Sequence, residues 1–301
     1  MTTRWLVTGA GGMLGRDVLA ELAADPDAVV TGVGRDQFDL TRPAAAHAAV
    51  AGHHVVVDCA AWPDVDRAEE VEAAAAAANG PGVRHLARAC AGSGTILLHV
   101  STDDVFSGDT GEPYPEDAPT RPVDAHGRDT VAGEQAVAEL LPRSGYVVRT
   151  AWLYGVHGPN FVTTMLELAA RRETLDVVAD QYGRPTWSRA LARQLAALGR
   201  AALAGRAPAG VYHGTAAGRT TWYGLARETF RLSGLDPERI RPVGSAVLPR
   251  PATRPAFGVL GEHGSWSRTG LVPLPPWDAL LAAALDTPVF AAMAAAARTG
   301  G

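Results

Sequence analysis

The chain has 301 residues, 47% of them hydrophobic, and a formal net charge of −5 at pH 7. This length suffices for one large α/β domain plus a smaller one, because single cores stop growing at roughly 250–300 residues. The net charge argues against general nucleic-acid binding, which needs a concentrated basic face. A phosphorylated small molecule would need only a few local arginines, so we expect that kind of ligand and no nucleic acid.

The sequence also predicts where the protein works. No apolar run reaches the roughly 18 residues that a spanning helix needs, and residues 4–8 form a strand pattern instead of a secretory leader. We therefore predict a cytoplasmic protein with no membrane partner. Cys59 and Cys90 lie in apolar or alanine-rich surroundings, which favours small buried side chains over a disulfide or metal pair. The histidines show no metal-ligand spacing, and we predict no metal.

The first motif is a glycine-rich turn. The apolar run at residues 4–8 leads into Gly9-x-x-Gly12-x-x-Gly15, and leucine and valine then recur at helical spacing over residues 13–24. Such glycines let the backbone approach a pyrophosphate, whose charge the free N–H groups of the helix then hold. A tight turn alone could explain the glycines, but their place between a first strand and a first helix indicates a dinucleotide site. The predicted contacts are Gly9, Gly12, Met13, Leu14 and Gly15.

The residue type after the second strand predicts which nicotinamide cofactor binds. This strand is expected at residues 28–33, and Arg35 follows it. An acidic residue there accepts hydrogen bonds from a ribose 2′-hydroxyl, whereas an arginine binds a 2′-phosphate. Arg35 favours NADPH, while Asp36 directly after it leaves NADH open and a solvated surface arginine is the plain alternative.

Residues 101–134 closely resemble the active-site segment of the extended short-chain dehydrogenase/reductases. In that family a Ser or Thr at the end of a buried strand faces a Tyr and a Lys, spaced i and i+4 on the next helix. Thr102 matches the strand position here, but the two helix positions read His126 and Thr130. The chain contains no lysine at all, so no other lysine can take that place.

Several further segments narrow the resemblance to one branch, the dTDP-4-dehydrorhamnose reductase family and related reductases of dTDP-4-keto-6-deoxyhexoses. They are residues 149–165, 178–186, 210–215, 222–230, 254–256 and 274–277. The resemblance covers essentially the whole chain in order. It implies a doubly wound parallel α/β sheet of the Rossmann type over residues 1–150 and a smaller α/β substrate domain over residues 151–301. Residues 179–205 are expected to return to the first domain.

The resemblance also assigns cofactor and structural residues. Asp39 and Leu40 match a turn that lies along the adenine ring. Ala60, Ala61 and Trp62 match a segment that passes beneath the ribose and nicotinamide, although Asp58 stands where asparagine is usual. Asn79 matches a structural or water-relaying asparagine, and we interpret it as structural.

On the substrate side, Trp152 and Asn160, with Phe161, match positions that line the sugar-nucleotide pocket, and Asp104 beside Thr102 is a further predicted contact. Arg189 and Arg254 are candidates for the diphosphate, because arginine binds phosphate oxygens in a bidentate way. Each could equally be a surface arginine. The sequence leaves a homodimer open.

The implied reaction is hydride transfer to C4 of a dTDP-4-keto-6-deoxyhexose, with a proton delivered to the resulting alkoxide. His126 is our candidate acid, because an imidazole titrates at about 6.5 and needs no lysine to help it. Thr102 would polarise the carbonyl, Asp103 would tune the site, and Thr130 would contact the ribose.

Two alternatives remain open. The loss of both catalytic side chains also suits a non-catalytic accessory protein that binds a nucleotide sugar or cofactor. Within the enzyme class, Tyr114, Tyr154 or a water relayed by Thr102 could donate the proton instead.

Overall fold

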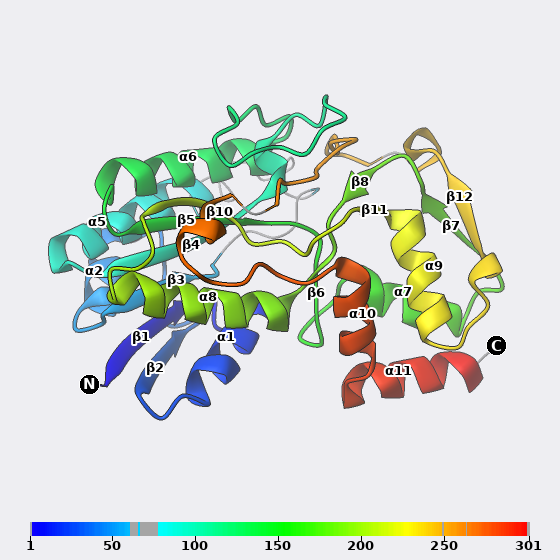
Figure 1. The fold of residues 1–301 in the computed structure, drawn as a ribbon, viewed down its shortest axis with the longest axis horizontal. Coiled ribbons are helices and arrows are strands. Elements are labelled where there is room, and N and C mark those ends of the chain that lie inside the picture. The colour runs from blue at the N-terminus through cyan, green and yellow to red at the C-terminus, as the bar shows by residue number, and fades with distance from the viewer. Residues whose placement is uncertain (1, 61–65, 67–77, 249, 263, 300–301) are drawn as a thin grey trace.

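The structure is a computed structural model that describes residues 2–60, 66, 78–248, 250–262 and 264–299. Two lobes lie side by side in Figure 1, a larger one with the N-terminus and a smaller one with the C-terminus. The larger lobe is built on a six-stranded sheet in the order β10-β5-β4-β3-β1-β2. All its neighbouring strands pair in parallel. The strands are β1 (Thr3–Thr8), β2 (Ala28–Val33), β3 (Val55–Asp58), β4 (Ile96–Thr102), β5 (Gly145–Thr150) and β10 (Gly210–His213).

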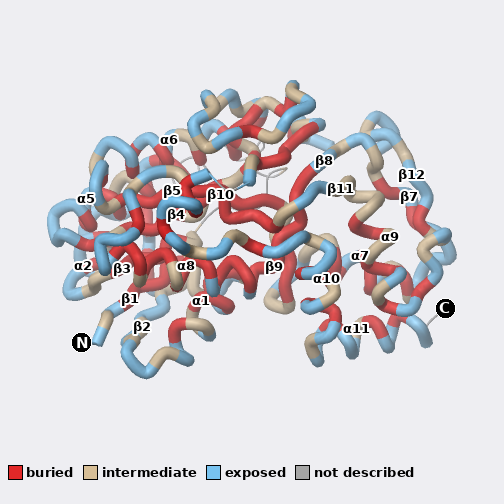
Figure 2. Tube along the Cα trace, in the orientation of Figure 1, coloured by how far each residue is buried: buried red, intermediate tan, exposed pale blue. Residues whose placement is uncertain are grey.

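Helices cover both faces of this sheet, which explains why its central strands are apolar on both sides. Side chains alternate along β1: Trp5 and Val7 pack with α1 (Met13–Ala23) and α8 (Ser188–Leu203), whereas Leu6 packs toward the opposite helices. The opposite face carries α2 (Pro43–Val50), α5 (Val83–Ser93) and α6 (Ala125–Leu140). The central strands of the sheet are correspondingly the most deeply buried part of this lobe in Figure 2. The predicted doubly wound α/β fold is confirmed.

The smaller lobe has its own core, built from short strand pairs and helices. Its strands are β6 (Leu153–Tyr154), β7 (Leu175–Val178), β8 (Tyr182–Gly183), β9 (Thr186–Trp187), β11 (Thr220–Thr221) and β12 (Ile240–Val243). Its helices are α7 (Phe161–Ala169), α9 (Trp222–Leu232), α10 (Trp277–Leu285) and α11 (Pro288–Thr299). Phe230 and Phe290 are fully buried at its centre.

Short helical turns complete the chain: η1 (Ala78–Gly82), η2 (Asp103–Val105), η3 (Pro237–Arg239), η4 (Ser245–Val247) and η5 (Ser265–Arg268). The chain crosses between the lobes more often than the sequence predicts. After α8 it adds β10 to the large sheet, so the returning segment extends past residue 205 to His213. Trp266 of η5 also joins the core of the larger lobe, donating its indole N–H to the His213 carbonyl at 2.9 Å.

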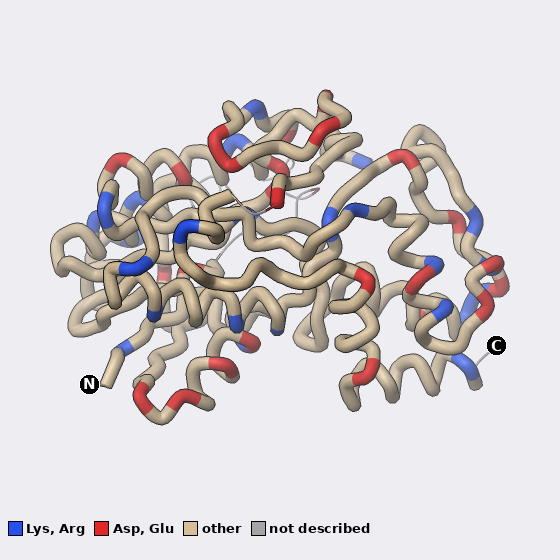
Figure 3. The backbone as a smooth tube through the Cα atoms, in the orientation of Figure 1, with Lys and Arg blue, Asp and Glu red and all other residues tan. Residues whose placement is uncertain are grey.

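Charged side chains of both signs are interspersed along the described chain in Figure 3. No single described helix is long and apolar enough to cross a membrane; α10 and α11 pass that test only when counted together, and they meet at an 80° bend. Both cysteines are free. Cys90 is buried in the core and Cys59 is half-buried at a cavity wall.

Candidate active site

A cavity of about 1810 Å³ lies between the two lobes. The carboxyl ends of the parallel strands open into it, which is where open α/β sheets bind their ligands. Its lining includes the glycine turn and Thr102 from the larger lobe, and Trp152 and Trp222 from the smaller one. The cavity can therefore hold a cofactor and a second ligand against each other.

The turn between β1 and α1 has the geometry of a dinucleotide cradle. Gly9 has a left-handed φ of 65°, and a Cβ there would lie 2.5 Å from the carbonyl oxygen of Cys59. A Cβ on Gly15 would lie 2.2 Å from the Gly9 oxygen. Gly12 begins the helix and has no side-chain cap, so the first N–H groups of α1 remain available to an anion. Only glycine permits this close turn, and the uncapped helix end suits a pyrophosphate.

The other predicted cofactor residues lie along the same side of the cavity. Arg35, Asp39, Leu40 and Ala60 all line it. The Asp39 carboxylate accepts hydrogen bonds from the backbone and side chain of Thr41, at 3.0 and 2.6 Å, and these bonds lower the pKa of Asp39. Asp39 therefore shapes the turn through its side chain. Ala61 and Trp62 lie outside the described residues.

Asp58 is fully buried at the end of β3. It occupies the position where the short-chain reductases that the sequence resembles usually have asparagine. Thr8 donates a hydrogen bond to it at 2.5 Å, and the Nδ1 atom of His99 lies 2.9 Å from its other oxygen. A buried carboxylate is stable only when it is paired and hydrogen-bonded. His99 is therefore the compensating partner, and it lies directly across the β3–β4 register from Asp58.

Thr102 ends β4 and caps η2, where its Oγ1 atom accepts a hydrogen bond from the backbone N–H of Asp104 at 3.2 Å. The same Oγ1 lies 3.2 Å from an oxygen of Asp103 and 3.4 Å from an oxygen of Asp104. Asp103 is only 7% exposed. Burial, followed by the negative charge of Asp104, raises the pKa of Asp103 well above its usual range.

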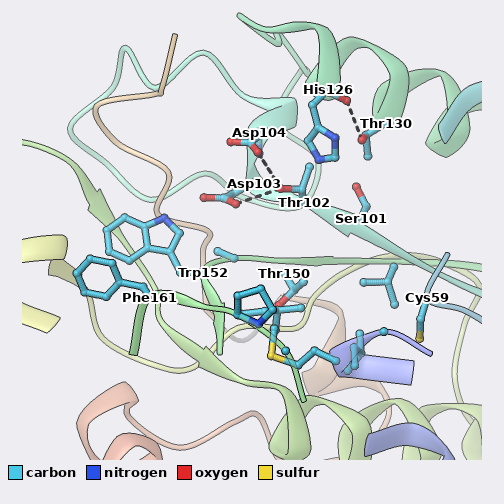
Figure 4. Close-up of a pocket in the computed structure, with 18 of the residues that line it drawn as sticks. Cys59, Ser101, Thr102, Asp103, Asp104, His126, Thr130, Thr150, Trp152 and Phe161 are labelled. Carbon is cyan, nitrogen blue, oxygen red and sulfur yellow. Dashed lines mark hydrogen bonds between the residues drawn. The ribbon is translucent and has the colours of Figure 1, made fainter. Parts of the chain in front are cut away.

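His126 lies on the first turn of α6, which begins at Ala125 after the capping residue Asp124. The Asp124 carboxylate caps this helix by accepting the N–H of Gly127 at 2.7 Å. His126 is 8% exposed and lines the cavity, with its Nδ1 atom 3.4 Å from the side-chain nitrogen of Asn79. In Figure 4 its ring lies next to Thr102. Thr130 also lines the cavity, but its hydroxyl donates to the His126 carbonyl at 2.9 Å.

Aromatic side chains form the wall opposite Thr102. Trp152 has a left-handed φ of 48°, rare for a large residue. Its ring stacks on Trp222, with centroids 3.5 Å apart and planes 7° apart. Gly183 allows this placement, since a Cβ there would lie 2.2 Å from the Trp152 ring. Trp152 and Phe161 both face the cavity in Figure 4 and offer an apolar surface to a base or sugar.

The family model described as the RmlD substrate binding domain matches residues 3–289. A dTDP-4-dehydrorhamnose reductase from Streptomyces griseus is 56% identical over 280 residues, covering 92% of this chain and 91% of the relative. The chain belongs to the RmlD family. The resemblance in the sequence is thereby confirmed.

Other members of the family agree. A dTDP-4-keto-6-deoxy-D-glucose reductase from Streptomyces niveus is 49% identical over 283 residues, covering 93% of this chain and 96% of the relative. The crystal structure of a dTDP-4-dehydrorhamnose reductase from Bacillus anthracis in complex with NADP superposes with a TM-score of 0.88 at 32% identity. That match covers 95% of this chain and 99% of the other.

Within this RmlD family member, two predicted substrate residues do not line the cavity. Asn160 caps α7, accepting the N–H of Thr163 at 3.1 Å and donating to the Gly155 carbonyl at 2.7 Å, so its polar atoms hold the loop. Arg189 points outward from the start of α8, with its guanidinium 5.9 Å from the Trp187 ring centroid. By contrast, Arg254 does line the cavity and pairs with Asp66 at 3.0 Å.

The two alternative tyrosine donors also lie away from the cavity. Tyr114 stacks on Phe106, and its hydroxyl accepts the Gly108 N–H at 2.9 Å. Tyr154 is 1% exposed in the core of the smaller lobe, where burial raises the pKa of its hydroxyl. Neither side chain reaches the cavity lining.

Sequence reasoning missed three residues of the site. Trp222 lines the cavity and stacks on Trp152. Arg250 lines the cavity near Arg254, and it lies 3.6 Å from Asp66. His99 pairs with Asp58 behind the cavity, and only the register of β3 and β4 in the structure shows this pair. Among the described residues, no group of three His, Cys, Asp or Glu side chains could hold a metal ion.

Proposed function

We propose that this protein reduces the C4 keto group of a dTDP-4-keto-6-deoxyhexose with NADPH, in the cytoplasm, as a step of deoxysugar biosynthesis. The observation that carries this proposal is the single cavity that joins the glycine turn of α1 to Thr102 and, beyond it, to the aromatic wall. The names of the relatives at 56% and 49% identity support it, because both are reductases of dTDP-linked keto sugars.

NADPH, when bound, supplies the hydride. The chain's own residues must hold the cofactor, orient the sugar and manage one proton. Arg35 is proposed to bind the 2′-phosphate of NADPH, and the uncapped start of α1 its pyrophosphate. Thr130 is proposed to contact the ribose. Because its hydroxyl hydrogen is already donated to the His126 carbonyl, it would accept a hydrogen bond from a ribose hydroxyl.

On the substrate side, Arg254 is proposed to bind the diphosphate and Trp152 to pack against the sugar nucleotide. The Nη1 atom of Arg254 is buried without a protein partner in the described structure, so a bound phosphate oxygen would satisfy it. Thr102 is proposed to polarise the C4 carbonyl, as the hydroxyl at the end of β4 that faces the cavity.

His126 is proposed to donate the proton to the C4 alkoxide, with Asp103 and Asp104 supporting the site. The imidazole lines the cavity beside Thr102, which places it within reach of the same oxygen. Its contact with Asn79 fixes the ring, so Asn79 acts on the site as well as on the fold.

One observation favours a second candidate function. The family's catalytic Tyr and Lys are both missing, and a cavity of this kind could bind a nucleotide sugar or cofactor without turnover. In that case the protein would serve as an accessory or regulatory subunit.

A single-turnover experiment separates the two. Mixing the enzyme and NADPH with a dTDP-4-keto-6-deoxyhexose should oxidise the cofactor, and His126→Phe should slow this by about 10²-fold or more, the typical contribution of a general acid. His47→Phe, on the exposed face of α2, is the matched control and should behave as the native chain. No oxidation by the native chain across a panel of such sugars would contradict the reductase. Full activity of His126→Phe would remove the histidine from the role of donor.

A further inference from the structure

Two adjacent carboxyl groups contact one hydroxyl in this site. Asp103 and Asp104 follow Thr102 on η2, and an oxygen of each lies within 3.4 Å of the Thr102 Oγ1 atom. All three residues line the cavity. In the view of Figure 4 the Thr102 hydroxyl lies between the two carboxyl groups and the ring of His126.

The hydrogen-bond inventory of Thr102 has room for one extra proton. A hydroxyl carries one hydrogen and two lone pairs, whereas an ionised carboxylate can only accept. One lone pair of Oγ1 takes the Asp104 backbone N–H. The single hydrogen can serve only one of the two carboxyl groups, so the other contact is a hydrogen bond only if that carboxyl group donates. Both contacts are satisfied when one of the two acids is protonated.

The surroundings place that proton on Asp103. Asp103 is 7% exposed and its Oδ2 atom abuts Gly258, where a Cβ would lie only 2.4 Å away. The charged groups that act on it are Asp104 on its own turn and Asp124 at the start of α6, and Asp124 in turn lies near His126 and Arg254. Arg254 is paired with Asp66, and the ion pairs among the described residues include none with either Asp103 or Asp104.

Electrostatics agree with this placement. Burial and the charges of Asp104 and Asp124 raise the pKa of Asp103 well above its usual range. The pKa of Asp124 is itself raised, chiefly by burial. A neutral Asp103 would donate its hydrogen to Oγ1, and Oγ1 would pass its own hydrogen to Asp104 or to a ligand.

We propose that Asp103 and Asp104 share one proton and that Asp103 delivers it, through the Thr102 hydroxyl, to the alkoxide formed at C4. This inference rests on the proposed reductase function. Reduction of C4 leaves O4 one proton short. The Thr102 O–H bond then breaks as a new O4–H bond forms, while Oγ1 takes the proton of Asp103. Asp103 becomes a carboxylate. It regains its proton from water that reaches the site beside Asp104, whose side chain is half-exposed. This route replaces His126 as the source of that proton. His126 then holds O4 by a hydrogen bond, so losing either side chain slows the reduction.

The test uses the full chain in single-turnover assays over a range of pH. Asp103→Asn is close to isosteric and should lower the rate of NADPH oxidation by about 10²-fold, the range for a general acid. Asp117 is exposed on a loop, so Asp117→Asn is the matched control and should leave the rate unchanged. Binding of NADPH and thermal unfolding of each variant report whether the fold survives.

The pH dependence of the rate distinguishes a proton donor from a residue that only supports the structure. Because the protonated carboxyl is the active form, the rate falls as pH rises through the pKa of the pair. Asp104→Asn removes the negative neighbour, so it should lower the pKa of Asp103 and shift this alkaline limb to lower pH. An unmoved limb in Asp104→Asn, or an Asp103→Asn rate within threefold of native, would overturn the inference.

Infrared difference spectroscopy separates this inference from the reductase proposal. A carboxylic-acid carbonyl band at neutral pH that disappears in Asp103→Asn supports the shared proton even if the native chain oxidises no NADPH. Absence of that band from the native chain would overturn the inference even if the reductase turns over.

Discussion

Gly15 shows how one missing side chain controls the cofactor end of the cavity. The first turn of α1 rests against the Gly9 carbonyl so closely that a Cβ on Gly15 would lie 2.2 Å from its oxygen. Real Cβ atoms do not approach an oxygen to that distance, so any larger residue must push the turn and the helix apart. The same turn carries the N–H groups proposed to hold the pyrophosphate.

We therefore expect Gly15→Ala to lower the free energy of unfolding by about 1–3 kcal/mol, the usual cost of overpacking, and to weaken NADPH binding. Denaturant unfolding and a fluorescence titration with NADPH measure the two effects. Gly92→Ala is the matched control, since it lies on the exposed face of α5 with open space around its Cβ. It should stabilise the helix by about 0.5–1 kcal/mol. Native affinity in Gly15→Ala would show that the turn adapts.

Single residues also show which parts of the site can be predicted from the sequence. The glycine spacing and the Thr102 position were predictable, because both depend on local backbone geometry at the end of a strand. Asn160 and Arg189 were not: Asn160 lies in a matching segment and Arg189 just after one, but the direction of each side chain depends on how α7 and α8 pack. Asp58 and His99 form a pair that becomes visible only once β3 and β4 are in register.

At the scale of elements, α6 carries His126 and Thr130, and a buried ion pair fixes its position on the sheet. Arg149 of β5 donates to both oxygens of Glu134, at 2.8 and 2.7 Å, and Ser101 of β4 donates to Glu134 at 2.5 Å. All three residues are buried. The pair therefore joins α6 to β4 and β5, the two strands that end beside Thr102 in the cavity wall.

Replacing Glu134 by Gln should leave the Arg149 charge buried without its partner. Breaking a buried pair on one side costs about 3–5 kcal/mol, so Glu134→Gln should lower the free energy of unfolding by that amount. Glu139→Gln removes the partner of Arg84 on the exposed side of the same helix, and its cost should stay below about 1 kcal/mol. Urea unfolding of the two variants compares them. Equal losses would mean that the buried pair does not anchor α6.

The elements themselves were largely predictable, and their long-range connections were not. The strands at residues 4–8 and 28–33 follow from apolar runs in the sequence. The joining of β10 to the sheet beyond residue 205, and the return of Trp266 to the larger lobe, depend on contacts between distant segments. No local pattern encodes those contacts.

At the scale of the whole molecule, the cavity lies between two separate cores. The larger lobe contributes the glycine turn and Arg35, and the smaller lobe contributes Trp152. Arg254, on the segment that also carries Arg250, lies on the cavity wall and pairs with Asp66. A ligand that binds only the folded state stabilises it by RT ln(1 + [L]/Kd). The two arginines should therefore affect stabilisation by two different ligands.

Thermal unfolding with NADP⁺ or with dTDP tests this division. At a concentration of 100 times Kd each ligand should stabilise the native chain by about 2.7 kcal/mol. Arg35→Gln should lose most of the shift with NADP⁺ and keep the shift with dTDP, because the 2′-phosphate loses its bidentate partner. Arg254→Gln should lose most of the shift with dTDP and keep the shift with NADP⁺. Each shift is measured against the same variant without ligand, so the stability lost with the Arg254–Asp66 pair does not enter the comparison. Arg206→Gln, on an exposed turn, should keep both shifts. If both cavity variants lose both shifts equally, the two ligands do not divide between the lobes as we propose.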